Sequence, residues 1–175
     1  MPSSNRQSSK TKAAIQSAFA ELVFTRRYSE LRMTDVARAA DIGRSTLYLH
    51  YPNIDAILLE NMAPLLNALA GPAGSSDATD RIEEVLRHIW SHRDRGRVVL
   101  FGVTGQKLER ALAQQITEIL PENEWKVAPV FIANQGAAAV FAILRTWLSG
   151  EASCDAKELA CHIHASLKAL VDETH

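Results

Sequence analysis

The amino-acid sequence predicts an all-α fold. Apolar residues recur at the three- and four-residue spacing of amphipathic helices along most of the chain, and no stretch alternates convincingly with the two-residue period of a strand. Glycine, proline and serine separate these periodic stretches, as in residues 71–77. At 175 residues and 47% hydrophobic content, the chain is long enough for a small domain fused to a larger one.

The net charge of -1 hides an asymmetry along the chain. Residues 1–52 hold eight basic and four acidic side chains, which gives +4, so the remaining 11 basic and 16 acidic side chains give -5. Only the first part of the chain is therefore suited to binding a polyanion such as DNA.

Two features indicate a cytoplasmic protein with no membrane partner. No apolar run reaches 18 residues, and the Ser-rich start lacks the apolar core of a signal peptide. Cys154 and Cys161 are seven residues apart, about two helical turns, which is too far along one helix for a disulfide. A reducing compartment suits such cysteines.

The first expected helix begins at Thr11 and follows an N-terminal arm. Residues 1–9, MPSSNRQSS, show no apolar periodicity and are expected to be flexible, with Ser8 and Ser9 as cap residues. Lys10 is a candidate for contact with a DNA phosphate. The helix carries its apolar stripe at Ile15, Ala18, Phe19, Leu22 and Val23.

Residues 34–51 predict two short helices joined by a sharp turn. Val36, Ala37 and Ala40 give the first helix a narrow apolar stripe, and Thr34 is expected to cap it. The sequence Asp-Ile-Gly at 41–43 then interrupts the pattern, because Asp tolerates a turn backbone and Gly can stand at the start of a new helix. This arrangement is typical of a helix-turn-helix motif.

In the second of these helices, Leu47 is expected to face inward and a polar set to face outward. Such side chains read base edges and bind phosphates in the DNA major groove. The expected DNA-binding residues are Thr34, Arg44, Ser45, Thr46, Tyr48, His50 and Lys10. Among them, Arg44 is expected to read a base, since a guanidinium can bind guanine through two hydrogen bonds.

The sequence TLYLHYPNIDAIL at 46–58, preceded by DVARAA at 35–40, resembles the DNA-binding domain of the tetracycline-repressor (TetR) family. The resemblance covers roughly residues 10 to 60. It implies an all-helical dimeric regulator, with an N-terminal three-helix domain that binds an operator and a C-terminal domain that binds a small molecule and dimerises. It also implies that Tyr48 contacts a phosphate. Ile54 stands where the family often has a phosphate-binding Lys, so no such contact is expected here.

The expected domain organisation is therefore an arm at 1–9, a DNA-binding domain at 10–53 and a regulatory and dimerisation domain at 54–175. A fourth helix over 54–69 would join the two domains. Pro64 lies within its apolar stripe, where it removes a backbone hydrogen bond. Two interpretations are open: a hinge that transmits ligand binding, or a helix end near Ala63.

The rest of the chain predicts further amphipathic helices and one apolar helix. They are expected over 82–90, within 96–105, over 108–119, over 129–148 and over 156–171. Residues 129–148 are apolar on nearly every face, which predicts a helix that is buried all round. With the helix 156–171 it is expected to form a four-helix bundle between two subunits. The expected dimer interface comprises Ala138, Phe141, Leu144, Trp147, Ile163 and Leu167.

An effector pocket is expected between the helices 54–69, 82–93 and 106–119. Apolar stripes on these helices can line a cavity for an apolar or aromatic small molecule. The expected pocket residues are His88, Trp90, His92 and Arg97. Binding of the effector there would weaken DNA binding by tilting the fourth helix.

These features predict a ligand-responsive transcriptional regulator, more often a repressor than an activator in such families, which binds an inverted-repeat operator as a homodimer. One alternative is a DNA- or protein-binding adaptor of the same fold without an effector, which predicts a filled interior. Another is a small helical metalloenzyme that uses the pair His88/His92 or the pair Cys161/His164. No HExxH, nucleophile-elbow or paired-carboxylate motif occurs, so no enzyme activity, metal or cofactor is expected.

Overall fold

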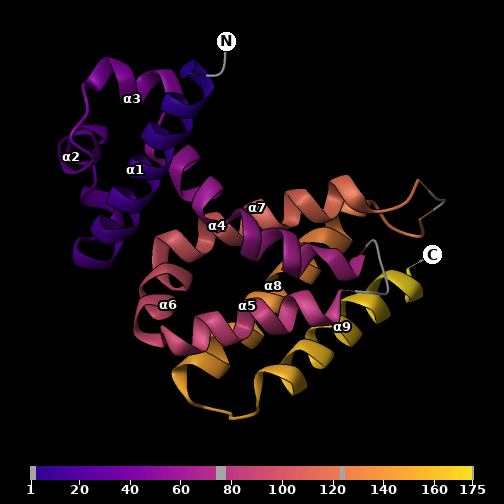
Figure 1. Cartoon of the computed structure of the whole chain (residues 1–175). Helices are drawn as coiled ribbons and strands as arrows, with labels where there is room; N and C mark the ends of the chain where they lie inside the picture. Colours follow the sequence, from indigo (N-terminus) through magenta and orange to yellow (C-terminus); the bar gives the residue numbers. More distant parts are fainter. Residues whose placement is uncertain (1–2, 74–77, 123–124, 175) are drawn as a thin grey trace. The chain divides into compact units, whose positions relative to one another are not determined.

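The computed structural model describes residues 3–73, 78–122 and 125–174, and within these ranges it contains helices and no strand (Figure 1). The predicted all-α fold is thus confirmed. The chain divides into two compact units, residues 1–62 and residues 63–175.

The N-terminal unit consists of three helices, a single 3-10 turn and the first part of a fourth helix. In order, they are α1 (Ser3–Thr25), η1 (Tyr28–Glu30), α2 (Met33–Ala39), α3 (Arg44–His50) and the beginning of α4 (Ile54–Ala70). Helix α1 packs against α2, and α2 packs against α3. The buried side chains of this unit include Ile15, Phe19, Val23, Leu31, Val36, Leu47, Tyr51, Ile57 and Leu58.

The predicted flexible arm is wrong for the residues that the structure describes, because α1 begins at Ser3 and residues 3–9 are helical. Met1 and Pro2 lie outside the described residues. Residues 6–10 are exposed and extend α1 beyond the apolar stripe that starts at Ile15. A fully solvated helical extension carries no apolar periodicity, so the pattern of apolar residues could not show it.

The boundary between the units falls after Met62 and not before Ile54, because polar contacts join the first turns of α4 to α1 and η1. Lys12 Nζ lies 2.7 Å from Glu60 Oε1, and Gln16 Nε2 donates a hydrogen bond to the same oxygen over 2.9 Å. The Tyr28 hydroxyl donates to the Asp55 carboxylate. These three contacts make the start of α4 part of the N-terminal unit.

Helix α4 continues past Pro64 to Ala70, so the interpretation of a helix end near Ala63 is wrong. Proline has no backbone N–H and therefore leaves the carbonyl one turn earlier without its usual helical partner. Pro64 itself is exposed, where water can satisfy that carbonyl. The helix is therefore continuous from the first unit to the second.

The C-terminal unit surrounds helix α8. After the last part of α4 come η2 (Gly71–Ala73), α5 (Thr79–Ser91), α6 (Arg93–Leu100), α7 (Gly102–Ile119), α8 (Pro129–Ser149) and α9 (Ala156–Glu173). Helix α8 packs against α6, α7 and α9, and α5 lies along α9 (Figure 1). Its core is apolar and includes Leu69, Ile82, Leu86, Leu108, Leu112, Ile116, Val140, Phe141, Leu144 and Ile163.

Within this chain helix α8 is buried on one side only, and the prediction that its other side is covered by a second subunit stays a prediction. Its exposed side carries Phe131, with 69% of its surface accessible, and Ala138 and Ala142. By length and composition alone α8 could cross a membrane, with a mean hydropathy of 1.2 over 18 residues. Its other side, however, packs as a core helix: Gly136 lies so close to α9 that an added Cβ would be 2.6 Å from Leu167 Cδ2.

The corner between α6 and α7 depends on a close backbone approach at Gly105. A Cβ added to Gly105 would lie 2.2 Å from the carbonyl oxygen of Leu100, well inside any permitted contact. The same carbonyl oxygen accepts a hydrogen bond from Arg145 Nε of α8 over 3.5 Å. Because the obstructing atoms belong to the backbone, they cannot move aside as a flexible side chain would.

We therefore expect Gly105→Ala to lower the free energy of unfolding by about 1–3 kcal/mol, the usual range for overpacking a tight site. The exposed neighbour Gln106 supplies the control, since Gln106→Ala is expected to stay within about 0.5 kcal/mol of the parent. Urea unfolding followed by far-ultraviolet circular dichroism measures both values. Equal stability of the two variants would contradict this account of the corner.

Candidate nucleic-acid interface

The turn between α2 and α3 forms as the sequence predicts. Asp41 has a φ of 52°, a left-handed conformation that Asp tolerates better than most residues. The backbone N–H of Ile42 donates to the carbonyl of Ala37 over 3.0 Å, which closes the turn. Gly43 is the N-cap of α3 in an extended conformation. The two helices are therefore joined by a tight, hydrogen-bonded connection.

The start of α2 differs from the prediction, because Arg32 and not Thr34 is the N-cap residue. The backbone N–H of Arg32 donates to Asp35 Oδ2 over 3.1 Å, and the Arg26 guanidinium lies 3.4 Å from Asp35 Oδ1. The carboxylate of Asp35 thus satisfies a backbone donor that a Thr hydroxyl would not reach. Thr34 lies inside the first turn of α2 and is partly exposed.

Helix α3 is anchored to the unit by Leu47, whose side chain has 0% exposure. Tyr51, directly after α3, is also buried, and its hydroxyl accepts a hydrogen bond from Gln16 Nε2 over 3.3 Å. Burial and the nearby Glu60 carboxylate raise the pKa of Tyr51 to about 12. Its phenol is therefore protonated at neutral pH, and its burial gives it a structural role in this unit.

The same physical effects act on Tyr28 at the other contact with α4. Burial, followed by the hydrogen bond to Asp55 and the charge of that carboxylate, raises the pKa of the Tyr28 phenol. An un-ionised phenol can donate to the carboxylate throughout the physiological pH range. This contact therefore keeps η1 joined to α4 under the conditions in which DNA would be bound.

The outward surface of α3 contains the predicted polar residues and one leucine that the sequence reasoning missed. Arg44, Ser45 and Tyr48 are exposed, and Thr46 and His50 are partly exposed. Leu49 is 85% exposed, more than Tyr48 at 55%. The side chain of Leu49 has no hydrogen-bonding group, so the pattern of polar residues on this helix did not indicate it.

Helical geometry orders these residues around the axis of α3. At about 100° per residue, Ser45 and Leu49 both lie about 160° from the buried Leu47 and form the outermost ridge. Tyr48 and Thr46 flank this ridge at about 100° on opposite sides. Arg44 lies only about 60° from Leu47, so its long side chain starts near the edge of the helix surface.

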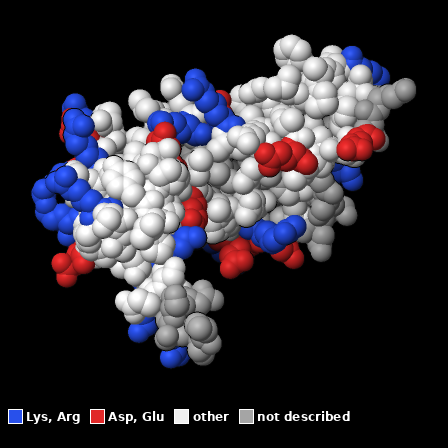
Figure 2. Space-filling model, turned by 90° about the horizontal axis from the view of Figure 1, so that it is seen from above, with Lys and Arg blue, Asp and Glu red and all other residues white. Residues whose placement is uncertain are grey.

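Several cations of the N-terminal unit remain exposed on its surface (Figure 2). Lys12, Arg26 and Arg27 each have a carboxylate within 4.0 Å. Among the residues that the structure describes, no ion pair within that distance involves the exposed Arg6, Lys10, Arg32, Arg38 or Arg44. The unit therefore keeps positive charge that its own carboxylates do not neutralise.

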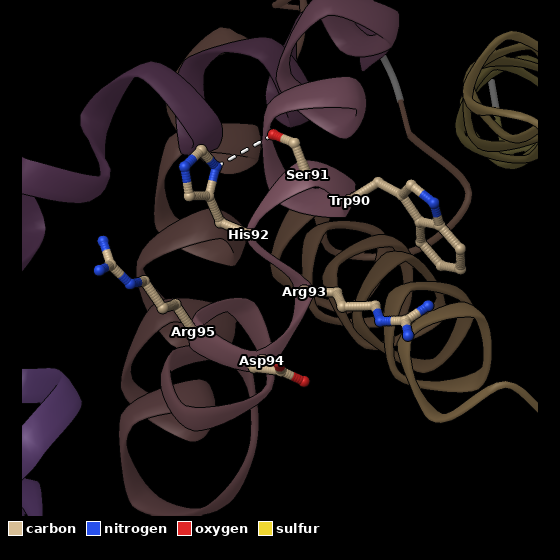
Figure 3. Close-up of a pocket in the computed structure, with 6 residues that line it drawn as sticks. All are labelled: Trp90, Ser91, His92, Arg93, Asp94 and Arg95. Carbon is tan, nitrogen blue, oxygen red and sulfur yellow. Dashed lines mark hydrogen bonds between the residues drawn. The ribbon is translucent and has the colours of Figure 1, made fainter.

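A separate pocket of about 370 Å³ opens at the turn between α5 and α6 (Figure 3). Residues 90–95 line it, with Trp90 and Arg93 on one side of the turn and His92 and Arg95 on the other. The Trp90 ring stacks on Trp147 with centroids 4.6 Å apart, and the Arg93 guanidinium lies 5.6 Å from the Trp90 ring. The pocket thus combines an aromatic wall with cationic groups.

Two of the four predicted pocket residues, Trp90 and His92, line this pocket. His88 lies one helical turn earlier, with its ring centroid 4.8 Å from that of His92. Arg97 was assigned wrongly: its Nε donates to the carbonyl of Leu148 over 2.7 Å, and its Nη2 donates to the carbonyl of Ser149 over 2.9 Å. It therefore caps the end of α8 and does not line the pocket.

The pocket also opens at the surface and not between the helices 54–69, 82–93 and 106–119, where it was predicted. Several apolar side chains of those helices are buried in the core of the C-terminal unit. These side chains are Leu65, Leu66, Leu69, Ile82, Leu86, Ile89, Leu108, Leu112 and Ile116.

The predicted dimer-interface residues need a similar correction. Phe141, Leu144, Trp147, Ile163 and Leu167 are buried inside this chain, and only Ala138 is exposed. Apolar periodicity marks the stripe that a helix buries but does not say whether the covering surface belongs to the same chain. In α8 and α9 the strongest apolar stripe covers the core of the subunit.

Neither ligand pair of the metalloenzyme alternative lies within a larger cluster. Over the residues described, no group of three or more His, Cys, Asp or Glu side chains is close enough to hold a metal ion. Cys161 is exposed, and the Nδ1 atom of His164 is buried without a hydrogen-bond partner in the described structure.

Residues 15–60 match the family model described as bacterial regulatory proteins, tetR family. Over 54 residues the chain is 35% identical to the HTH-type transcriptional regulator EthR of Mycolicibacterium smegmatis (strain ATCC 700084 / mc(2)155). That segment is 31% of this chain and 25% of the relative, so the chain matches about a quarter of the relative's length.

Similar solved structures extend along nearly the whole chain. A TetR transcriptional regulator from Streptococcus agalactiae 2603V has a TM-score of 0.60 at 22% identity, over 94% of this chain and 97% of that one. FadR of Thermus thermophilus, a TetR-family repressor solved in complex with lauroyl-CoA, has a TM-score of 0.53 at 20% identity. The match covers 89% of this chain and 92% of that one. At these identities the likeness shows the fold.

The match of residues 15–60 and the helix-turn-helix geometry lead to one conclusion: the N-terminal unit contains a DNA-binding helix-turn-helix like that of the tetR-family regulators, and the chain shares their fold.

Proposed function

We propose that the chain acts in the cytoplasm as a ligand-responsive repressor that binds an inverted-repeat operator as a homodimer. The observation that carries the DNA-binding part is the exposed surface of α3, together with cations of the same unit that have no carboxylate within 4.0 Å among the described residues. A short helix with one buried anchor can enter the major groove, which is wide enough for a helix.

In this proposal the residues divide by the part of DNA that they contact. Ser45 on the outer ridge of α3 faces base edges, and Arg44 reaches them with its long side chain from the edge of the helix surface. Thr46, Tyr48 and His50 on the sides of α3 and Thr34 on α2 bind phosphates. Lys10 on α1 adds a further phosphate contact. Phosphate contacts supply affinity that falls with salt, and base contacts supply the sequence preference.

We expect Arg44→Ala to cost about 1–3 kcal/mol at the preferred DNA site and to relax the preference at one base position. A salt titration of binding to specific and random duplexes, followed by fluorescence anisotropy, separates base reading from phosphate binding. Arg81→Ala, which removes an exposed Arg of the C-terminal unit, is the control and should bind as the parent does. An Arg44→Ala variant with unchanged affinity for both duplexes would refute the role of Arg44.

The dimer is proposed to form through the exposed sides of α8 and α9. Small side chains stand there at helical spacing, Ala138 and Ala142 on α8 and Cys161, Ala165 and Ala169 on α9, so that helices of two subunits could approach closely. Phe131 adds a large exposed apolar side chain to the same side of α8. Two helices from each subunit would then make a four-helix bundle with a twofold axis.

We expect Ala138→Arg to convert the dimer into a folded monomer, because a charge at the interface would lose its water without gaining a partner. Ala138 is exposed within the chain, so circular dichroism should show an unchanged fold. Gln106→Arg, at an exposed position of α7, should remain dimeric. Sedimentation at micromolar concentration measures both, and a folded Ala138→Arg variant that stays dimeric would place the interface elsewhere.

An apolar or aromatic effector is proposed to bind at the pocket beside Trp90 and to weaken DNA binding. The exposed face of Trp90 can stack on an aromatic ring, and Arg93 offers charge beside it. The same fold carries lauroyl-CoA in FadR, which is support at the level of the fold alone. The adaptor alternative predicts a filled interior and no effector, so the effector requires its own experiment.

We expect a compound that weakens operator binding about tenfold, a coupling of about 1.4 kcal/mol, to be bound about tenfold more weakly in the presence of operator. A panel of aromatic and fatty acids can be screened by loss of DNA anisotropy. The compound should quench tryptophan emission in the parent and in Trp125→Phe, but much less in Trp90→Phe. If no compound changes DNA affinity, or if its affinity is equal with and without operator, the adaptor alternative is the better one.

A further inference from the structure

We infer that Leu49 is a specificity-determining residue that reads the C5-methyl group of a thymine in the major groove. The inference rests on the proposed DNA binding and deepens it, since it names the chemical group that one side chain would recognise. It is carried by the exposure of Leu49 and by its place on α3.

Leu49 is the most exposed of the large hydrophobic side chains in the described structure, with 85% of its surface accessible. A single exposed leucine is ordinary on a protein surface. Its position is what distinguishes it here: with Ser45 one turn before, it forms the ridge of α3 opposite the buried Leu47. When α3 enters a groove, this ridge goes deepest.

The ridge cannot recognise bases through hydrogen bonds at Leu49, because a leucine side chain has neither donor nor acceptor. In the major groove, thymine carries a C5-methyl group at its edge, and none of the other three bases carries a methyl group there. Contact between the leucine and that methyl removes apolar surface of both from water. Cytosine or guanine at the same place would leave a polar edge against the leucine.

The residues around Leu49 are compatible with this role. Ser45 on the ridge is short and leaves room for the longer leucine to reach the base. Tyr48, 55% exposed, flanks the ridge on one side, and Thr46 flanks it on the other. Polar contacts on both flanks would hold the helix in register while Leu49 covers one methyl group.

The test is a comparison of thymine with uracil, which differs only in lacking the C5-methyl group. The preferred duplex is first selected from a randomised library with the parent protein. Each thymine of a half-site is then replaced by deoxyuridine, and the affinities of the parent and of Leu49→Ala are measured by anisotropy. At one position the parent should bind uracil about fourfold more weakly, the value expected for one buried methyl group. Leu49→Ala should bind the two duplexes equally.

Two further variants keep the result specific. Leu49→Met retains an apolar side chain of similar size and should restore much of the preference for thymine. Leu59→Ala removes another exposed leucine of the same unit, on α4 away from the ridge, and should discriminate as the parent does. Because no phosphate contact is lost, the salt dependence of Leu49→Ala should equal that of the parent.

The outcomes separate the inference from the function on which it rests. Failure of the parent to select any common sequence would overturn the proposed DNA binding itself. A selected sequence with no methyl effect at any thymine, or a methyl effect that Leu49→Ala retains, would overturn the role of Leu49 and leave the DNA binding standing.

Discussion

The burial of Leu47 fixes the orientation of α3, and the rest of the DNA-facing surface depends on it. Helix α3 has seven residues, and Leu47 is its only buried side chain. A helix of this length has little stability of its own, so its position comes from packing. Because one buried residue determines which side faces inward, it also determines that Ser45 and Leu49 face outward. The tight turn at Asp41 and the buried Tyr51 hold the two ends of the helix around this anchor.

Helix α4 is the element through which the two units are joined along the chain. Its first turns are held by Tyr28, Lys12 and Gln16 of the N-terminal unit, and its last turns contribute Leu65, Leu66 and Leu69 to the buried side chains of the C-terminal unit. The helical assignment is continuous at Pro64. Because side-chain contacts hold the start of α4 to the N-terminal unit, a displacement of α4 would strain those contacts.

Much of the fold could be predicted from the sequence because most helices bury an apolar stripe, and the bounds of α3, α8 and α9 agree closely with that stripe. The pattern failed where no burial occurs, as in residues 3–9. The pattern also failed to distinguish the buried side of α8 from its exposed side. Ala138 and Leu144 are both apolar residues, but only Leu144 is buried. For the site, hydrogen-bonding capacity pointed to Arg44 and Tyr48 but not to Leu49, whose exposure only the structure shows. The role of Arg97 was unpredictable, because its partners are backbone carbonyls more than 50 residues further along the chain.

The capping of α8 by Arg97 has a consequence for the pocket beside Trp90. Arg97 belongs to α6, the helix that also carries Arg93 and Asp94 of the pocket rim, and its guanidinium ties that helix to the end of α8. Trp90 is tied to α8 as well, through its stacking on Trp147. Trp90 and helix α6, which form the two walls of the pocket, are thus both in contact with α8 in the absence of a ligand. A ligand entering there would meet an already ordered rim, so less of its binding free energy would be lost to restricting side-chain and backbone motion.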